Sequence, residues 1–241
     1  MQAKAMESWS GKRVAGGARL GRWFTRLLGR SPRPLPQHPG RADDSGYYAT
    51  QLADRQGDTR LFAPWAQRAP DLRAQRHDDA SGVNALVRLF SHDATMAGLG
   101  AQGLGTLASY MEYAEVDAGK RIVGQDEQGD YLLILLQGAV AEDRHQPSGA
   151  KVRLGEVRAG EVLGELSMLD GTTRLCSCTA LTPVHVAVLT QAALARLMAE
   201  QPGLAAVLLV WLGKRLSMRL RQVSARASVL LTRLPKADTG R

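Results

Sequence analysis

The chain has 241 residues and is 44% hydrophobic but only 5% aromatic, so Leu, Val and Ala must supply most of the core of one or two domains. Its formal net charge of +8 favours an acidic partner, which leaves a nucleotide, nucleic acid, an anionic membrane or an acidic protein open. Its two cysteines, Cys176 and Cys178, are too close in sequence for an ordinary structural disulfide, which excludes a disulfide framework and fits a reducing cytoplasm.

The distribution of apolar residues argues against a membrane-spanning or secreted protein. A spanning helix needs roughly 18 to 20 apolar residues, whereas the longest candidate here covers only residues 204–212. The basic N-terminus lacks the apolar segment of a secretory signal. We therefore expect a cytoplasmic protein.

Residues 1–84 are rich in Arg, Gly and Pro and predict a basic, mostly disordered N-terminal extension. Within this extension, residues 12–30 contain basic side chains and no acidic one. Apolar residues recur there at helical spacing, as Leu20, Trp23, Phe24, Leu27 and Leu28. A basic amphipathic helix of this kind can dock on an anionic membrane, peripheral to its inner face, or on an acidic partner. The pattern fits a solvated arm equally well.

Residues 85–200 have the pattern of a globular domain. Leu86, Leu89 and Phe90 begin a helical face, and the period then changes beyond Glu112. The apolar run 131–136, bounded by glycines, predicts a buried strand. Shorter strands are expected at residues 152–154, 177–181 and 184–189. Many short strands separated by glycine turns indicate a small sandwich or barrel.

Residues 201–241 are expected to form a C-terminal lid and dimerisation helix. A helix at residues 192–199 ends at Pro202-Gly203, and a longer one follows to about residue 234. Its apolar residues alternate at spacings of four and three, at Leu216, Leu220, Val223, Ala227, Leu230 and Leu234. This is the pattern of a coiled-coil seam, which predicts a parallel homodimer. Packing of the same stripe on the chain's own barrel is the alternative.

The segment from Leu163 to Arg174, LGELSMLDGTTR, carries the most specific signal. A short helix that follows a strand-ending glycine offers free amides to an anion, and an Arg ten residues after that glycine can meet phosphate oxygens with two hydrogen bonds. The segment resembles the phosphate cassette of the cyclic-nucleotide-binding domains shared by the catabolite activator protein, protein kinase A regulatory subunits and cyclic-nucleotide-gated channels. Turn glycines of that family match Gly138, Gly155 and Gly160, and the resemblance spans about residues 85–235.

The resemblance implies a mainly β fold with flanking helices: a small antiparallel jelly-roll barrel, a long C-terminal helix and an N-terminal arm. It also implies that the cyclic phosphate meets the amides of Leu166 and Ser167 and the guanidinium of Arg174, while Glu165 accepts a hydrogen bond from the ribose 2′-hydroxyl. The expected ligand-binding residues are Gly164, Glu165, Leu166, Ser167, Arg174, Leu175 and Cys176.

Two of these positions depart from the family pattern. Leu175 stands where the family often has Ser or Thr, and the loss of that hydroxyl favours cAMP over cGMP. Cys176 replaces the usual Ala and narrows the site.

Other motifs predict no further chemistry. The glycine-rich residues 98–103 match the sequence pattern of a dinucleotide-binding loop, but no buried strand precedes them as that loop requires. We expect a loose helical turn there. The histidines lack metal-ligand spacing, and the Cys176-x-Cys178 pair has no second Cys or His pair nearby. We therefore expect no metal, no cofactor and no enzyme activity.

The predicted function is that of a regulatory protein which binds a cyclic nucleotide and passes the signal to a protein effector through its C-terminal helix. The alternative is a transcription regulator of the catabolite activator type. That class reads DNA with a helix-turn-helix after the long helix, and only seven residues follow Leu234. We therefore expect no sequence-specific DNA binding, and the alternative requires non-standard contacts or a partner.

Overall fold

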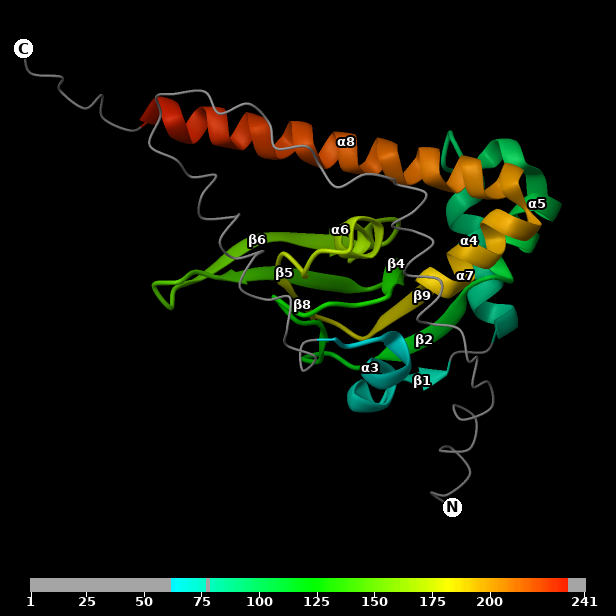
Figure 1. Cartoon of the computed structure of the whole chain (residues 1–241), viewed down its shortest axis with the longest axis horizontal. Coiled ribbons are helices and arrows are strands. Elements are labelled where there is room, and N and C mark those ends of the chain that lie inside the picture. The colour runs from blue at the N-terminus through cyan, green and yellow to red at the C-terminus, as the bar shows by residue number, and fades with distance from the viewer. Residues whose placement is uncertain (1–61, 77–78, 234–241) are drawn as a thin grey trace, which may run out of the picture.

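The structure is a computed structural model that describes residues 62–76 and 79–233 (Figure 1). The amphipathic stretch at residues 12–30 lies outside the described residues. The elements in chain order are α3 (Trp65–Leu72), β1 (Gln75–Arg76), α4 (Asp79–Ser91), the 3-10 helix η2 (Ala97–Leu99), α5 (Gly100–Ala108), β2 (Glu112–Val116), β3 (Arg121–Val123), β4 (Tyr131–Gln137), β5 (Ala139–His145), β6 (Lys151–Arg158), β7 (Val162–Leu163), α6 (Glu165–Asp170), β8 (Ser177–Ala180), β9 (Val184–Thr190), α7 (Gln191–Glu200) and α8 (Pro202–Arg233).

The strands form two sheets, with the orders β1-β2-β9-β4-β7 and β3-β8-β5-β6. Every pairing between these described strands is antiparallel. The predicted mainly β jelly roll with flanking helices and a long C-terminal helix is confirmed. The glycine-rich residues 98–103 lie in η2 and α5, as expected for a helical turn.

The position of strand β4 in the sheet accounts for the uninterrupted apolar run at residues 131–136. It lies between β9 and β7, and residues 131–135 are fully buried. Side chains alternate across a strand, so Tyr131, Leu133 and Leu135 enter the core between the two sheets. Leu132 and Ile134 enter a second core beneath the helices. Both faces of this strand are therefore covered.

The second core joins the five-stranded sheet to α4, α5, α7 and the first half of α8 (Figure 1). Trp211 of α8 is buried there, its ring centroid 5.1 Å from that of Phe90 in an edge-on contact. Its indole N–H donates to a carboxylate oxygen of Asp93 at 3.0 Å, and Arg215 contacts the same oxygen at 3.2 Å. These contacts fix the point from which the rest of α8 extends.

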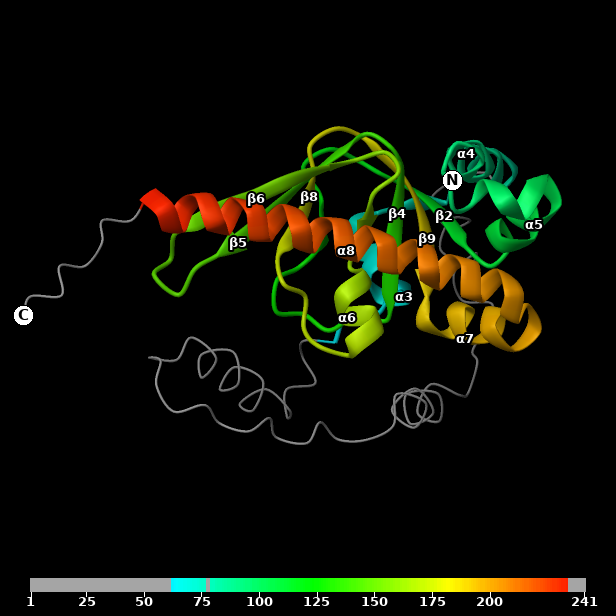
Figure 2. The ribbon, with the colours of Figure 1, turned by 90° about the horizontal axis from the view of Figure 1, so that it is seen from above.

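Beyond Trp211 and Leu212, α8 leaves the second core and passes over β5 and β6 (Figure 2). Its apolar side chains there are largely exposed, with Leu220 67% and Val223 56% accessible. Among the described residues, no helix is both long and apolar enough to cross a membrane.

Ordered elements begin earlier than the predicted domain boundary at residue 85. Helix α3 buries Trp65, Ala69 and Leu72 against the barrel core. The Trp65 amide donates to the carboxylate of Asp130 at 3.0 Å, and its ring lies 5.3 Å from that of Tyr131. This helix could not be predicted from the sequence. Its apolar residues are few, and they are separated by charged residues and by Pro70, which lies inside the helix. Helix α3, strand β1 and the start of α4 thus lie within the last part of the expected extension at residues 1–84.

Candidate functional site

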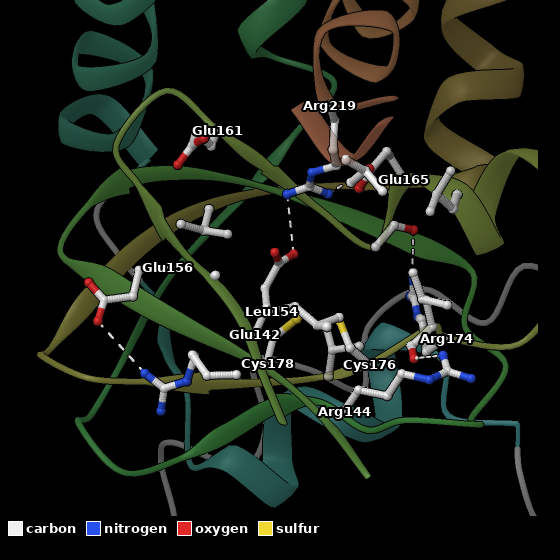
Figure 3. Close-up of a pocket in the computed structure, with 18 of the residues that line it drawn as sticks. Glu142, Arg144, Leu154, Glu156, Glu161, Glu165, Arg174, Cys176, Cys178 and Arg219 are labelled. Carbon is white, nitrogen blue, oxygen red and sulfur yellow. Dashed lines mark hydrogen bonds and ion pairs between the residues drawn. The ribbon is translucent and has the colours of Figure 1, made fainter. Parts of the chain in front are cut away.

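A cavity of about 690 Å³ lies between the four-stranded sheet, the short helix α6 and the overlying α8 (Figure 3). This volume is typical of a small-molecule site. Its lining includes all seven residues expected to bind ligand: Gly164, Glu165, Leu166, Ser167, Arg174, Leu175 and Cys176. The sequence segments 164–167 and 174–176 therefore meet at one cavity.

Gly164 connects β7 to α6 in a left-handed conformation with φ of 76°. Such a φ favours glycine, and a Cβ at this position would also overlap the guanidinium of Arg174. Helix α6 starts at the next residue without a side-chain cap at Gly164. The cassette glycine is thus required by its backbone conformation and by the approach of Arg174.

Arg174 is only 4% exposed although it carries a positive charge. Its guanidinium donates hydrogen bonds to the carbonyl oxygens of Gly164 and of Tyr131, the latter at 2.7 Å, and lies 4.6 Å from the centre of the Tyr131 ring. Within residues 62–76 and 79–233, no acidic side chain forms an ion pair with it. Burial lowers the pKa of Arg174, which reflects the cost of holding this cation away from water.

Arg219 of α8 joins two carboxylates across the cavity. One of its terminal nitrogens lies 3.1 Å from Glu165 Oε1, and the other lies 3.2 Å from Glu142 Oε1 on β5. Figure 3 shows Arg219 between the two acids, with dashed lines to both. The interaction ties α8 to the cassette and to the four-stranded sheet.

Burial and the opposite charges act in opposite directions on the pKa values of the three groups of this bridge. Burial raises the pKa of Glu165 and of Glu142, and the positive charge of Arg219 opposes both shifts. Burial lowers the pKa of Arg219 itself, but the two carboxylates outweigh burial, so its pKa is raised. Each charge of the bridge therefore offsets part of the cost of burying the others.

Two apolar side chains of the cassette face the cavity and remain accessible. Leu166 is 39% exposed and Leu175 is 50% exposed. Val223 of α8 also lines the cavity. Together they offer an apolar surface on which a flat ring could lie.

Sequence reasoning missed the cavity residues outside the cassette, chiefly Glu142 and Arg219. Arg219 lies 45 residues beyond Arg174, outside the cassette motif. A signal was available, because a buried Glu165 needs a cation partner and a helix folded over the cassette can supply one. Glu142 gave no signal, because its role depends on the pairing of β5 with β8.

Comparison with known proteins places this geometry in a family context. A family model described as "Cyclic nucleotide-binding domain" matches residues 114–201. The crystal structure of a cyclic nucleotide-binding domain from Methylobacillus flagellatus is similar with a TM-score of 0.61 and 28% identity, and the match covers 70% of this chain and 93% of that one.

Two similar sequences match this chain over only part of their own length. A CRP-like cAMP-activated global transcriptional regulator of Mycobacterium tuberculosis is 28% identical over 119 residues, which are 49% of this chain and 53% of that protein. The cGMP-dependent protein kinase egl-4 of Caenorhabditis briggsae is 39% identical over 83 residues, which are 34% of this chain and 10% of that protein. The match thus spans about half of one relative and a tenth of the other.

The fold and the cavity define a jelly-roll domain with a cavity of small-molecule size beneath α8. More specifically, the chain contains a cyclic nucleotide-binding domain, similar to that of a CRP-like regulator. Domains of this family are typically not catalytic.

Proposed function

We propose that the cavity binds a 3′,5′-cyclic mononucleotide and that the chain is a regulatory protein rather than an enzyme. The observation that carries this proposal is Arg174, a buried cation beside the cavity that has carbonyl partners but no carboxylate partner among the described residues. A buried charge without an opposite charge is costly. A bound phosphate would supply that opposite charge, which a neutral ligand would not.

The other cavity residues support the same ligand. The amides of Leu166 and Ser167 start a helix next to Arg174 and would face the phosphate. Glu165 would accept a hydrogen bond from the ribose 2′-hydroxyl. Leu175 offers the base a methyl surface and no hydroxyl, which favours cAMP over cGMP.

We propose that α8 carries the signal to a protein effector. Arg219 already contacts Glu165, so a ribose hydroxyl at Glu165 would change the partners of Arg219 and the position of α8. A ligand can shift a conformational equilibrium only through such differential contacts. Because α8 is anchored at Trp211 and free of the second core beyond it, a small change at Arg219 moves the helix end.

A second copy of the chain is the partner that we propose for the exposed stripe of α8. Leu220 is one of the seam residues, and it is exposed in the single chain, whereas Val223 lines the cavity. Leu234 lies outside the described residues. A coiled-coil partner would cover this stripe.

The alternative function, a DNA-binding regulator, draws its support from the similarity to the mycobacterial regulator over half of that protein. The basic residues of α8 argue against direct DNA contact through this helix. Arg215 contacts Asp93, Arg219 contacts two glutamates and Arg226 donates to the carbonyl of Leu154. We propose a cytoplasmic protein without sequence-specific DNA binding, with residues 12–30 as a peripheral anchor for an anionic membrane.

Nucleotide preference tests the proposal. We expect the full chain to bind cAMP more tightly than cGMP in parallel calorimetric titrations. Leu175→Thr should narrow this preference because it restores a hydroxyl near the base, whereas Leu181→Thr, an exposed leucine away from the cavity lining, serves as the matched control. Equal binding of both nucleotides by the natural chain would contradict the assignment of cAMP, and binding of neither would contradict the function.

A further inference from the structure

The two cysteines of the chain lie at the cavity beside an acid from a neighbouring strand. Cys178 is in β8 and pairs in register with Glu142 of β5, and Cys176 directly precedes β8. The two Sγ atoms and a carboxylate oxygen of Glu142 lie within 4.8 Å of one another. Figure 3 shows both sulfur atoms next to Glu142. All three side chains line the cavity.

This donor set matches the chemistry of zinc. Zn²⁺ binds thiolates at about 2.3 Å and carboxylate oxygens at about 2.0 to 2.2 Å, usually with tetrahedral geometry. Tetrahedral ligands at those lengths are separated by roughly 3.5 to 4 Å. The three donor atoms lie within 4.8 Å of one another, so a shift of about an ångström would bring them to the separation of a tetrahedral site.

We propose that Glu142, Cys176 and Cys178 form a binding site for a thiophilic divalent cation, Zn²⁺, at the wall of the cavity. Three protein ligands leave the fourth position open to the cavity, as in zinc sites that keep a water or a small ligand. The Cys-x-Cys pair has no second Cys or His pair nearby in sequence, but the pairing of β8 with β5 supplies Glu142 as the third ligand.

Burial and charge support the site. Cys176 and Cys178 are 9% and 2% exposed, so the two sulfur ligands are shielded from solvent while the fourth position faces the cavity. Two thiolates and one carboxylate carry three negative charges, which Zn²⁺ and the neighbouring Arg219 would neutralise.

The test uses the full chain, reduced and freed of metal, titrated with Cd²⁺ and Zn²⁺ without any nucleotide. Because the chain has only these two cysteines, a thiolate-to-Cd²⁺ charge-transfer absorption reports this pair alone. We expect one equivalent of Cd²⁺ to produce that absorption, and one equivalent of Zn²⁺, added in the absence of Cd²⁺, to protect both thiols from alkylation.

Variants separate the proposed ligands from their surroundings. Glu142→Gln should weaken binding of Zn²⁺ by at least about tenfold, and Cys176→Ser should abolish the absorption. Glu156→Gln, which changes another glutamate of the cavity, should leave affinity unchanged. Circular dichroism of each variant confirms folding. A folded natural chain without the absorption at stoichiometric Cd²⁺, or alkylation unaffected by Zn²⁺, would overturn the proposal, as would unchanged affinity in folded Glu142→Gln. Failure here leaves the nucleotide proposal intact.

Discussion

Replacing Arg219 by Met tests the bridge between α8 and the cavity. Met keeps much of the apolar stem and removes the charged hydrogen bonds to Glu165 and Glu142. Breaking a buried ion pair costs about 3 to 5 kcal/mol. The Arg219 side chain is 35% exposed, however, and solvent screening reduces the cost. We therefore expect the free energy of unfolding to fall by about 2 kcal/mol at neutral pH, the range of one charged hydrogen bond.

The loss should depend on pH with a defined sign. Burial raises the folded-state pKa of both Glu142 and Glu165, and Arg219 opposes this. Without Arg219, both pKa values rise further. A carboxyl with a raised folded-state pKa costs no stability when protonated and costs stability as the pH rises through that pKa. The deficit of Arg219→Met should therefore be largest at neutral pH and shrink toward about pH 4, the ordinary range of a glutamate.

Urea unfolding near pH 7.5 and near pH 5 measures this effect, with stability taken from the transition midpoint and slope. Arg221→Met is the matched control, because Arg221 lies exposed on the same helix and its replacement should change stability by no more than about 0.5 kcal/mol. The reasoning is refuted if the Arg219→Met deficit is the same at both pH values, or if the control loses as much.

Three further predictions follow from the fold. Gly164→Ala should lower the unfolding midpoint and weaken nucleotide binding, because an alanine strains at φ of 76° and overlaps Arg174; an unchanged thermal melt would contradict this. Leu220→Asp should convert a dimer to a monomer in light scattering, because it places a charge in the proposed seam, and a monomeric natural chain at micromolar concentration would end the dimer proposal. Deleting residues 1–31 should abolish sedimentation with anionic vesicles, because each basic residue near such a surface contributes about 1 kcal/mol; equal sedimentation of the shortened chain would show that this stretch is no anchor.

The sequence predicted the fold where local pattern and tertiary environment agree. Residues 131–136 are apolar throughout because β4 is covered on both faces, so the run was a direct signal of a central strand. Helix α3 was not predicted because its few apolar residues form no helical pattern of their own. It is held by contacts of Trp65 with Asp130 and Tyr131, which lie far along the chain.

The candidate site was predictable as far as it is continuous in sequence. Gly164, Glu165 and Arg174 form a recognisable motif, and the structure brings them to one cavity. Arg219 and Glu142 were not predictable in the same way. Their roles arise from where α8 crosses the sheet and from the register of β5 with β8, which depend on packing between distant segments.

Calorimetric titration of the full chain with cAMP, beside Arg174→Leu, tests the central claim most directly. Arg174 would make charged hydrogen bonds worth about 1.5 to 3 kcal/mol each to the phosphate. We expect the natural chain to bind with a Kd of about 1 μM or tighter, near −8 kcal/mol. The variant, shown to be folded by circular dichroism, should bind at least about tenfold more weakly, since 1.4 kcal/mol corresponds to a factor of ten. Equal affinity of the two folded chains for cAMP would contradict the role of this cassette.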